Sequence, residues 1–134
     1  MKVICFRGGG GTGKSSIIKR ILDETYNIKI NKKGDVSLSF VQDNLKIGIC
    51  SYGDTEKCLE KYLKPLKDEN CDIILCACHK KGKTKTYEFI IKEFDDSTKF
   101  IECIRIKGDE NIEDYIKEKI FEFKKLIKAI SLST

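Results

Sequence analysis

The residues with the most specific chemical potential lie close to the N-terminus. Gly8, Gly13, Lys14 and Ser15 follow the spacing G-x-x-x-x-G-K-[ST], and only Arg7 separates them from the apolar run at residues 3–6. Glycines let consecutive backbone amides turn toward an anion, and the positive end of a following helix adds to the attraction. The lysine would reach the β- and γ-phosphates of a nucleotide, and the serine hydroxyl would coordinate Mg²⁺ between them. This pattern predicts a site for a nucleoside triphosphate and Mg²⁺.

The whole loop is expected to take part in binding. The predicted nucleotide-binding set consists of Gly8, Gly9, Gly10, Gly11, Thr12, Gly13, Lys14, Ser15 and Ser16. Within this set, Lys14 is also expected to be catalytic, and Ser15 is expected to be a metal ligand.

Such a loop needs a strand before it and a helix after it, and the sequence predicts both. Ile17, Ile18, Ile21 and Leu22 have helical spacing, so the helix is expected to reach about Thr25. The same reasoning predicts further strands at residues 36–40, 45–50, 72–78 and 99–107, and further helices at 55–66, 84–94 and 112–130.

Strands that alternate with helices indicate an α/β fold. We expect a single domain over residues 1–134, a three-layer sandwich of about five mostly parallel strands with helices on both faces. Ligands bind at the carboxyl ends of the strands in such sheets, so segments 8–15, 51–54 and 79–83 should meet at one edge. The first two strands after the loop form either a hairpin or a neighbouring pair with a short connection, and Pro65 kinks or ends its helix.

Residues 3–16 resemble the first strand, Walker A loop and first helix of the P-loop NTPases. The loop is similar to the glycine-rich loop of the partition-type and metal-insertion ATPases, which carry a signature lysine where this chain has Gly9. The resemblance implies the P-loop NTPase fold, ATP and Mg²⁺ as ligands, and ATP hydrolysis or phosphoryl transfer.

Residues 31–34 are similar to the guanine-reading N-K-x-D element of GTPases, but Gly34 replaces the acid and no D-x-x-G element is present. ATP is therefore expected rather than GTP.

The resemblance also implies a second acidic residue beside the metal, at the end of a neighbouring apolar strand. Asp54 follows the run at residues 45–50 after three intervening residues. We expect Asp54 to be a catalytic carboxylate that binds Mg²⁺ or positions water. The alternative is that Asp54 or Thr55 serves as the N-cap of the next helix. Asp35 is a weaker rival for the acidic role, and Ser51 and Tyr52 could assist by hydrogen bonding.

Composition limits the compartment and the partners. The net charge is +5, but the 26 basic residues are spread over every segment, so nucleic acid is not an expected partner. We find no apolar run long enough for a signal peptide or a membrane span, and we therefore expect a cytoplasmic protein without a membrane partner.

The seven cysteines are an odd number and stand mostly in apolar stretches. They are expected to be reduced core thiols rather than disulfides or a metal cluster.

Three functions fit these features. The leading expectation is a slow ATPase whose site is completed by a protein partner or by a second copy of the chain, since 134 residues leave little room for a lid. The alternatives are a small-molecule or nucleotide kinase, whose basic loop at residues 80–85 would hold the acceptor, and a nucleotide-sensing interaction module without turnover. Among the three arginines, Arg7 and Arg105 could approach bound phosphate. His79, the one histidine of the chain, is either a contact in this site or a surface residue.

Overall fold

The computed structural model describes residues 1–82, 84–106 and 111–132. The strands in this part of the chain are β1 (Lys2–Arg7), β2 (Ser37–Gln42), β3 (Leu45–Cys50), β4 (Ile73–Cys78) and β5 (Thr98–Glu102). The helical elements are α1 (Lys14–Tyr26), α2 (Glu56–Cys58), the π-helical turn η1 (Leu59–Leu63), α3 (Lys64–Asp68), α4 (Thr86–Phe94), the 3₁₀ turn η2 (Asp95–Ser97) and α5 (Ile112–Leu132).

The five strands form one sheet in the order β2-β3-β4-β1-β5. Strand β1 is parallel to both of its neighbours, β4 and β5, and β3 is parallel to β4. Only the edge strand β2 runs antiparallel, because a two-residue turn joins it to β3. Asp43 and Asn44 in this turn have φ values of 54° and 67°, which is the backbone conformation of the tight turns that favour hairpins. The hairpin alternative is confirmed.

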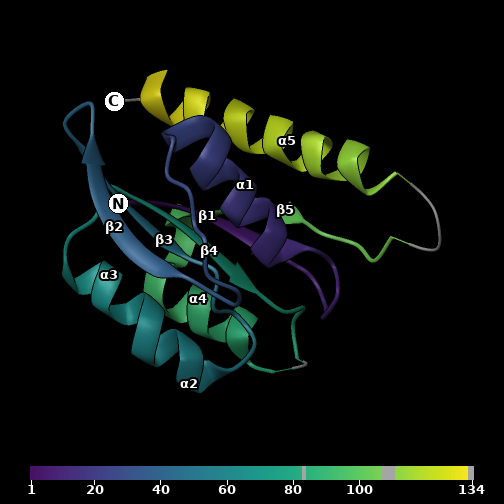
Figure 1. Cartoon of the computed structure of the whole chain (residues 1–134). Coiled ribbons are helices and arrows are strands. Elements are labelled where there is room, and N and C mark those ends of the chain that lie inside the picture. The colour runs from purple at the N-terminus through teal and green to yellow at the C-terminus, as the bar shows by residue number, and fades with distance from the viewer. Residues whose placement is uncertain (83, 107–110, 133–134) are drawn as a thin grey trace.

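Each face of the sheet is covered by helices, which gives three layers (Figure 1). Successive residues of β1 alternate between the two faces: Ile4 packs with α1 and α5, and Cys5 packs with α4 and the helical stretch from α2 to α3. The expected α/β arrangement of five mostly parallel strands between helices is confirmed.

Six of the seven cysteines are buried, and all seven are free thiols, as expected; Cys58 is half-buried.

Two local expectations are corrected. Of the two alternatives for Pro65, the one in which it ends the helix is wrong, because helical structure continues to Asp68; the turn before Pro65 is π-helical, and the Lys64 amide bonds back to the Leu59 carbonyl. Strand β5 ends at Glu102 rather than at residue 107, which itself lies outside the described residues. The described helices include none that combines the length and the apolar character needed to cross a bilayer.

Candidate functional site

The loop at residues 8–13, called the glycine loop below, joins β1 to α1 at the carboxyl edge of the sheet. At its start, the Gly8 amide donates to the Cys78 carbonyl at the end of β4, over 3.1 Å. A Cβ atom on Gly8 would lie 2.4 Å from the Cys103 carbonyl oxygen, so glycine is required for this close approach. At the other end, Gly13 has a φ of 82° and immediately precedes α1. The glycine loop is therefore held between the ends of β4 and β5.

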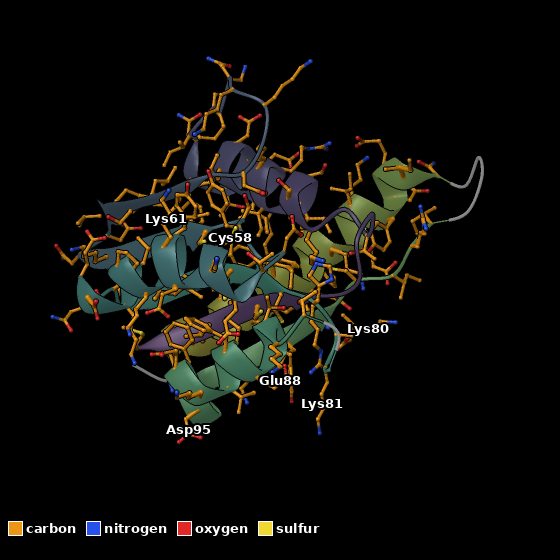
Figure 2. All side chains as sticks on the ribbon, turned by 90° about the horizontal axis from the view of Figure 1, so that it is seen from below. Cys58, Lys61, Lys80, Lys81, Glu88 and Asp95 are labelled. Atoms are coloured by element: carbon orange, nitrogen blue, oxygen red, sulfur yellow. The ribbon has the colours of Figure 1, made fainter. Side chains whose placement is uncertain are left out.

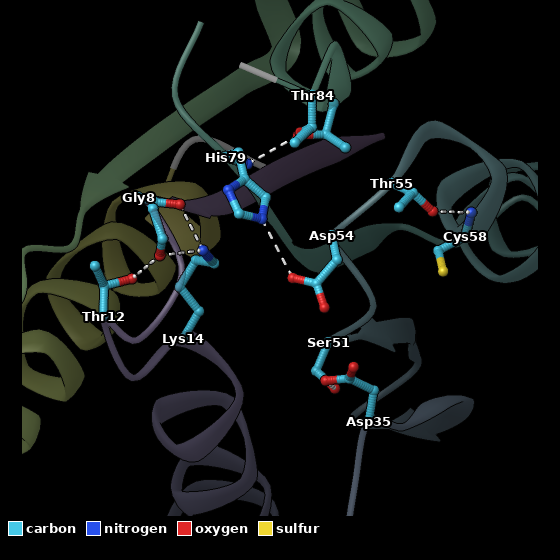
Figure 3. A network of polar contacts seen from close by, with 12 residues as sticks. Gly8, Thr12, Lys14, Asp35, Ser51, Asp54, Thr55, Cys58, His79 and Thr84 are labelled. Atoms are coloured by element: carbon cyan, nitrogen blue, oxygen red, sulfur yellow. Dashed lines mark hydrogen bonds and ion pairs between the residues drawn. The ribbon is translucent and has the colours of Figure 1, made fainter.

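The side chain of Lys14 is folded into the glycine loop (Figure 3). Its ammonium donates to the carbonyls of Gly8 and Gly9 over 2.5 and 2.9 Å, and the residue is only 8% exposed. The Thr12 hydroxyl donates to the same Gly9 carbonyl over 2.8 Å. Burial lowers the pKa of Lys14, and the nearby Asp54 carboxylate opposes this shift. The loop thus encloses a desolvated cation at the point where the sequence predicts phosphate binding.

Asp54 faces His79, the first residue after β4. The distance between His79 Nε2 and Asp54 Oδ1 is 3.2 Å, and the Asp54 side chain is 72% exposed (Figure 3). The backbone beside each partner is fixed: the His79 amide donates to the Thr86 hydroxyl over 2.9 Å, and a Cβ on Gly53 would lie 2.5 Å from the Ala77 carbonyl oxygen. Two neighbouring strands therefore present an acid and an imidazole at the edge that carries Lys14.

The N-cap of the helix after β3 is Thr55, whose hydroxyl accepts from the Cys58 amide over 3.1 Å. The alternative that Asp54 caps this helix is therefore wrong, because Asp54 turns toward His79 instead. Asp35, the rival candidate for the acidic role, has a different partner from Asp54. It accepts a hydrogen bond from the buried Ser51 hydroxyl over 3.0 Å, and that hydroxyl accepts from the Val36 amide. Ser51 thus orients Asp35 rather than Asp54.

A pocket with a volume of about 230 Å³ adjoins the glycine loop. One wall is the loop and the first turn of α1; the other is formed by apolar side chains before and within α5. The lining residues are Gly11, Thr12, Gly13, Ser16, Ile106, Ile112, Tyr115 and Ile116. Of the two serines expected at the site, Ser16 is exposed and lines this pocket, while Ser15 is half-buried in the same helical turn.

Tyr115 joins the two walls of the pocket. Its hydroxyl donates to the Thr12 carbonyl and accepts from the Ile104 amide, both over 3.0 Å, and burial raises its pKa to about 12. Sequence reasoning did not identify this residue. The available signal was a polar tip placed on the apolar face of the last helix, where a buried tyrosine usually needs a hydrogen-bond partner.

The basic loop between β4 and α4 lies at the same edge but turns outward. Figure 2 shows the side chains of Lys80 and Lys81 pointing away from the protein, and both residues are exposed. The Gly82 amide donates to the Glu88 carboxylate over 2.8 Å, which closes the loop onto its own helix. Lys83 lies outside the described residues. The three segments expected to meet at this edge therefore do so within the described residues, but the described lysines at 80 and 81 do not face the glycine loop.

The thiols and acids do not assemble a metal cluster in the described part of the chain, where no group of three or more histidine, cysteine, aspartate or glutamate side chains could hold a metal ion. Cys78 packs instead against Cys5, with 3.4 Å between the sulfur atoms, inside the core on one face of the sheet. The expectation of core thiols is confirmed for six of the seven cysteines, and Cys58 is half-buried.

Neither a protein-family model, nor a curated protein, nor a solved structure matches this chain significantly.

Proposed function

We propose that this chain is a P-loop protein that binds ATP with Mg²⁺ through residues 8–16 and hydrolyses it slowly. The observation that carries the proposal is the buried Lys14 ammonium inside a glycine loop that runs from a parallel strand into a helix. The ammonium has two backbone carbonyls as partners. A triphosphate offers stronger acceptors at the same place, because phosphate oxygens are charged. Binding would therefore move Lys14 from the carbonyls of Gly8 and Gly9 to the β- and γ-phosphates.

The residues that would hold Mg²⁺ are Ser15 and Asp54. The Asp54 carboxylate has a single described partner, through one oxygen, and is largely exposed, so its other oxygen is available to the metal or to a metal-bound water. One hydroxyl and one carboxylate suit Mg²⁺, which usually keeps several waters and takes its remaining ligands from the phosphates. When bound, Mg²⁺ would neutralise charge on the β- and γ-phosphates.

The apolar pocket supports a nucleotide rather than a simple phosphate as the ligand. It begins at Gly11 and Gly13 of the glycine loop and extends between Ile106 and Ile116. A phosphate chain bound along the loop would place its nucleoside next to this pocket, and apolar walls suit the flat face of a base.

Hydrolysis would form a bond between a water oxygen and the γ-phosphorus, and it would break the bond to the bridging oxygen, which leaves with ADP; the proton of the attacking water would pass to the released phosphate or to solvent. Lys14 would offset the charge that accumulates on these oxygens, and Asp54 would orient the water. We expect a low rate, because Asp54 is exposed and bulk water weakens its effect. A protein partner or a second copy of the chain that covers Asp54 would complete the site and raise the rate.

The test is isothermal titration of the full chain with Mg²⁺ and a nonhydrolysable ATP analogue. Lys14→Ala should weaken binding by about 10- to 100-fold, the range expected for hydrogen bonds between charged groups. Because Lys14 is buried, Lys14→Met serves as a second variant that keeps the packing of the stem. Lys19→Ala, one turn further along α1, is the matched control and should bind like wild type. Equal affinity in all four proteins, or no binding by wild type, would exclude the proposal.

Phosphate release and phosphate transfer separate the proposed ATPase from the kinase alternative. With ATP as substrate, an ATPase releases inorganic phosphate without any added acceptor. A kinase instead transfers the γ-phosphate to a nucleoside, nucleotide or metabolite. Stoichiometric ATP binding with neither product over hours would favour the nucleotide-sensing module.

A further inference from the structure

The segment after β5 runs alongside the glycine loop. The Cys103 amide donates to the Arg7 carbonyl at the end of β1, over 2.8 Å. The Cys103 carbonyl oxygen lies so close to Gly8 that even a Cβ atom there would be 2.4 Å away. The backbone at residue 103 is therefore pressed against the start of the glycine loop.

The next residue is attached to the far end of the same loop. The Ile104 amide donates to the Tyr115 hydroxyl, and that hydroxyl donates to the Thr12 carbonyl. The Tyr115 ring also passes 3.8 Å from the position that a Cβ atom on Gly13 would occupy. Residues 103 and 104 are thus fixed to both ends of the loop, and the position of residue 105 follows from theirs.

Arg105 places its guanidinium beside Gly11, in the middle of the loop. Its Nε, Nη2 and Cζ atoms lie 3.7, 3.8 and 3.9 Å from the position of a Cβ atom on that glycine. The residue is exposed. Gly11 also lines the apolar pocket, and so does Ile106, the neighbour of Arg105 in the chain. The guanidinium therefore stands where the glycine loop meets the pocket.

The other two arginines are already paired with carboxylates. Arg7 binds Glu102, and Arg20 binds Glu113 through two hydrogen bonds of 2.8 and 3.0 Å. Within residues 1–82, 84–106 and 111–132, Arg105 has no carboxylate within ion-pair distance. Guanidinium groups bind phosphate through paired hydrogen bonds, so an arginine beside the glycine loop that pairs with no carboxylate among these described residues is equipped to bind an anionic ligand.

We propose that Arg105 binds the phosphate chain of the nucleotide at its nucleoside end, at the α- or β-phosphate. The proposal rests on the function proposed above and adds a second cationic ligand from the same chain. Lys14 would contact the phosphates from inside the loop, while Arg105 would contact them from the side of the pocket. The pocket and the loop would then be bridged by one side chain, and this part of the site would need no arginine from a partner.

The experiment compares wild type, Arg105→Ala and Arg105→Lys by isothermal titration with Mg²⁺ and ADP, and with Mg²⁺ and a nonhydrolysable ATP analogue. A contact to the α- or β-phosphate predicts about a tenfold loss for both nucleotides in Arg105→Ala. Arg105→Lys should show a smaller loss, because lysine keeps the charge but not the paired donors. Lys99→Ala is the matched control: it removes an exposed positive charge from the opposite end of β5. Thermal melting of each variant checks the fold.

Each result decides the role of Arg105. Unchanged affinity in Arg105→Ala, with wild type binding both nucleotides, would overturn this inference and leave the proposed function intact. A loss for the ATP analogue alone would also overturn it, because it would place the arginine at the γ-phosphate. An equal loss of nucleotide affinity in Lys99→Ala would show that only the overall charge of the protein matters. It would overturn the specific contact between Arg105 and the phosphates. Failure of wild type to bind either nucleotide would overturn both proposals together.

Discussion

Replacing Gly8 with alanine tests how closely the end of β5 is packed against the glycine loop. The added methyl group would lie 2.4 Å from the Cys103 carbonyl oxygen and 2.9 Å from the Thr12 hydroxyl oxygen. Gly8 does not have a positive φ, so this contact is the main penalty. Relief requires the backbone at residue 103 to move away, which would strain its hydrogen bond to the Arg7 carbonyl.

The expected cost combines two terms. Overpacking a well-packed site costs about 1–3 kcal/mol, and the loss of one backbone hydrogen bond adds about 1 kcal/mol. We therefore expect Gly8→Ala to lower the free energy of unfolding by about 2–4 kcal/mol. Gly9→Ala is the matched control, since no atom lies within 4 Å of its added methyl group and its φ is not positive. Its stability should stay within about 1 kcal/mol of wild type.

The assay is urea-induced unfolding followed by circular dichroism, with the slopes compared to confirm that the same surface is exposed in each protein. A large loss in Gly8→Ala beside a small change in Gly9→Ala is the expected result. Equal stability of the two variants would refute the packing of residue 103 against the loop, and with it the positional argument for Arg105.

Three further outcomes are expected. Tyr115→Phe should lower the free energy of unfolding by about 1–3 kcal/mol, measured by urea unfolding, because it leaves the Ile104 amide and the Thr12 carbonyl without their shared partner; a change below about 0.5 kcal/mol would contradict this. Burial raises the pKa of Tyr26 from 10.0 to about 12, so its contribution to stability is complete below pH 10 and is lost as the pH rises toward 12. Thermal melts across this range should show a smaller alkaline loss in Tyr26→Phe than in wild type, and identical losses would argue against the raised pKa. Asp54→Asn should slow ATP hydrolysis about tenfold or more and weaken the dependence of nucleotide affinity on Mg²⁺; unchanged Mg²⁺ dependence and rate would remove Asp54 from the site.

The elements with local signals were predictable from the sequence. An apolar run, a glycine cluster and helically spaced isoleucines predict β1, the glycine loop and α1, because each signal lies within a few residues of the structure that it specifies. The alternation on β2 and the Asp43–Asn44 turn predicted two strands with a short connection, and the structure decides between the two alternatives in favour of a hairpin. Helix α5 follows from apolar residues at helical spacing, and the structure begins it at Ile112 as expected.

The contacts that assemble the site were less predictable, because they join distant parts of the chain. Thr12 and Tyr115 are 103 positions apart, and Asp54 and His79 are 25 apart. Neither pair carries a local pattern that identifies its partner. The end of β5 depends on the same kind of contact: the Ile104 amide bonds to a tyrosine of α5 instead of to a neighbouring strand. An alternating sequence there predicts a longer strand, and the tertiary contact overrides it.

The position of Lys14 Nζ in a structure with bound nucleotide would show whether the glycine loop binds the phosphates. Crystals of the full chain grown with Mg²⁺ and a nonhydrolysable ATP analogue should show this nitrogen within hydrogen-bond distance of the β- and γ-phosphate oxygens. Its present bonds to the carbonyls of Gly8 and Gly9 should then be broken. A nucleotide bound away from the glycine loop, with Lys14 still held by those two carbonyls, would contradict the proposed binding of ATP by residues 8–16.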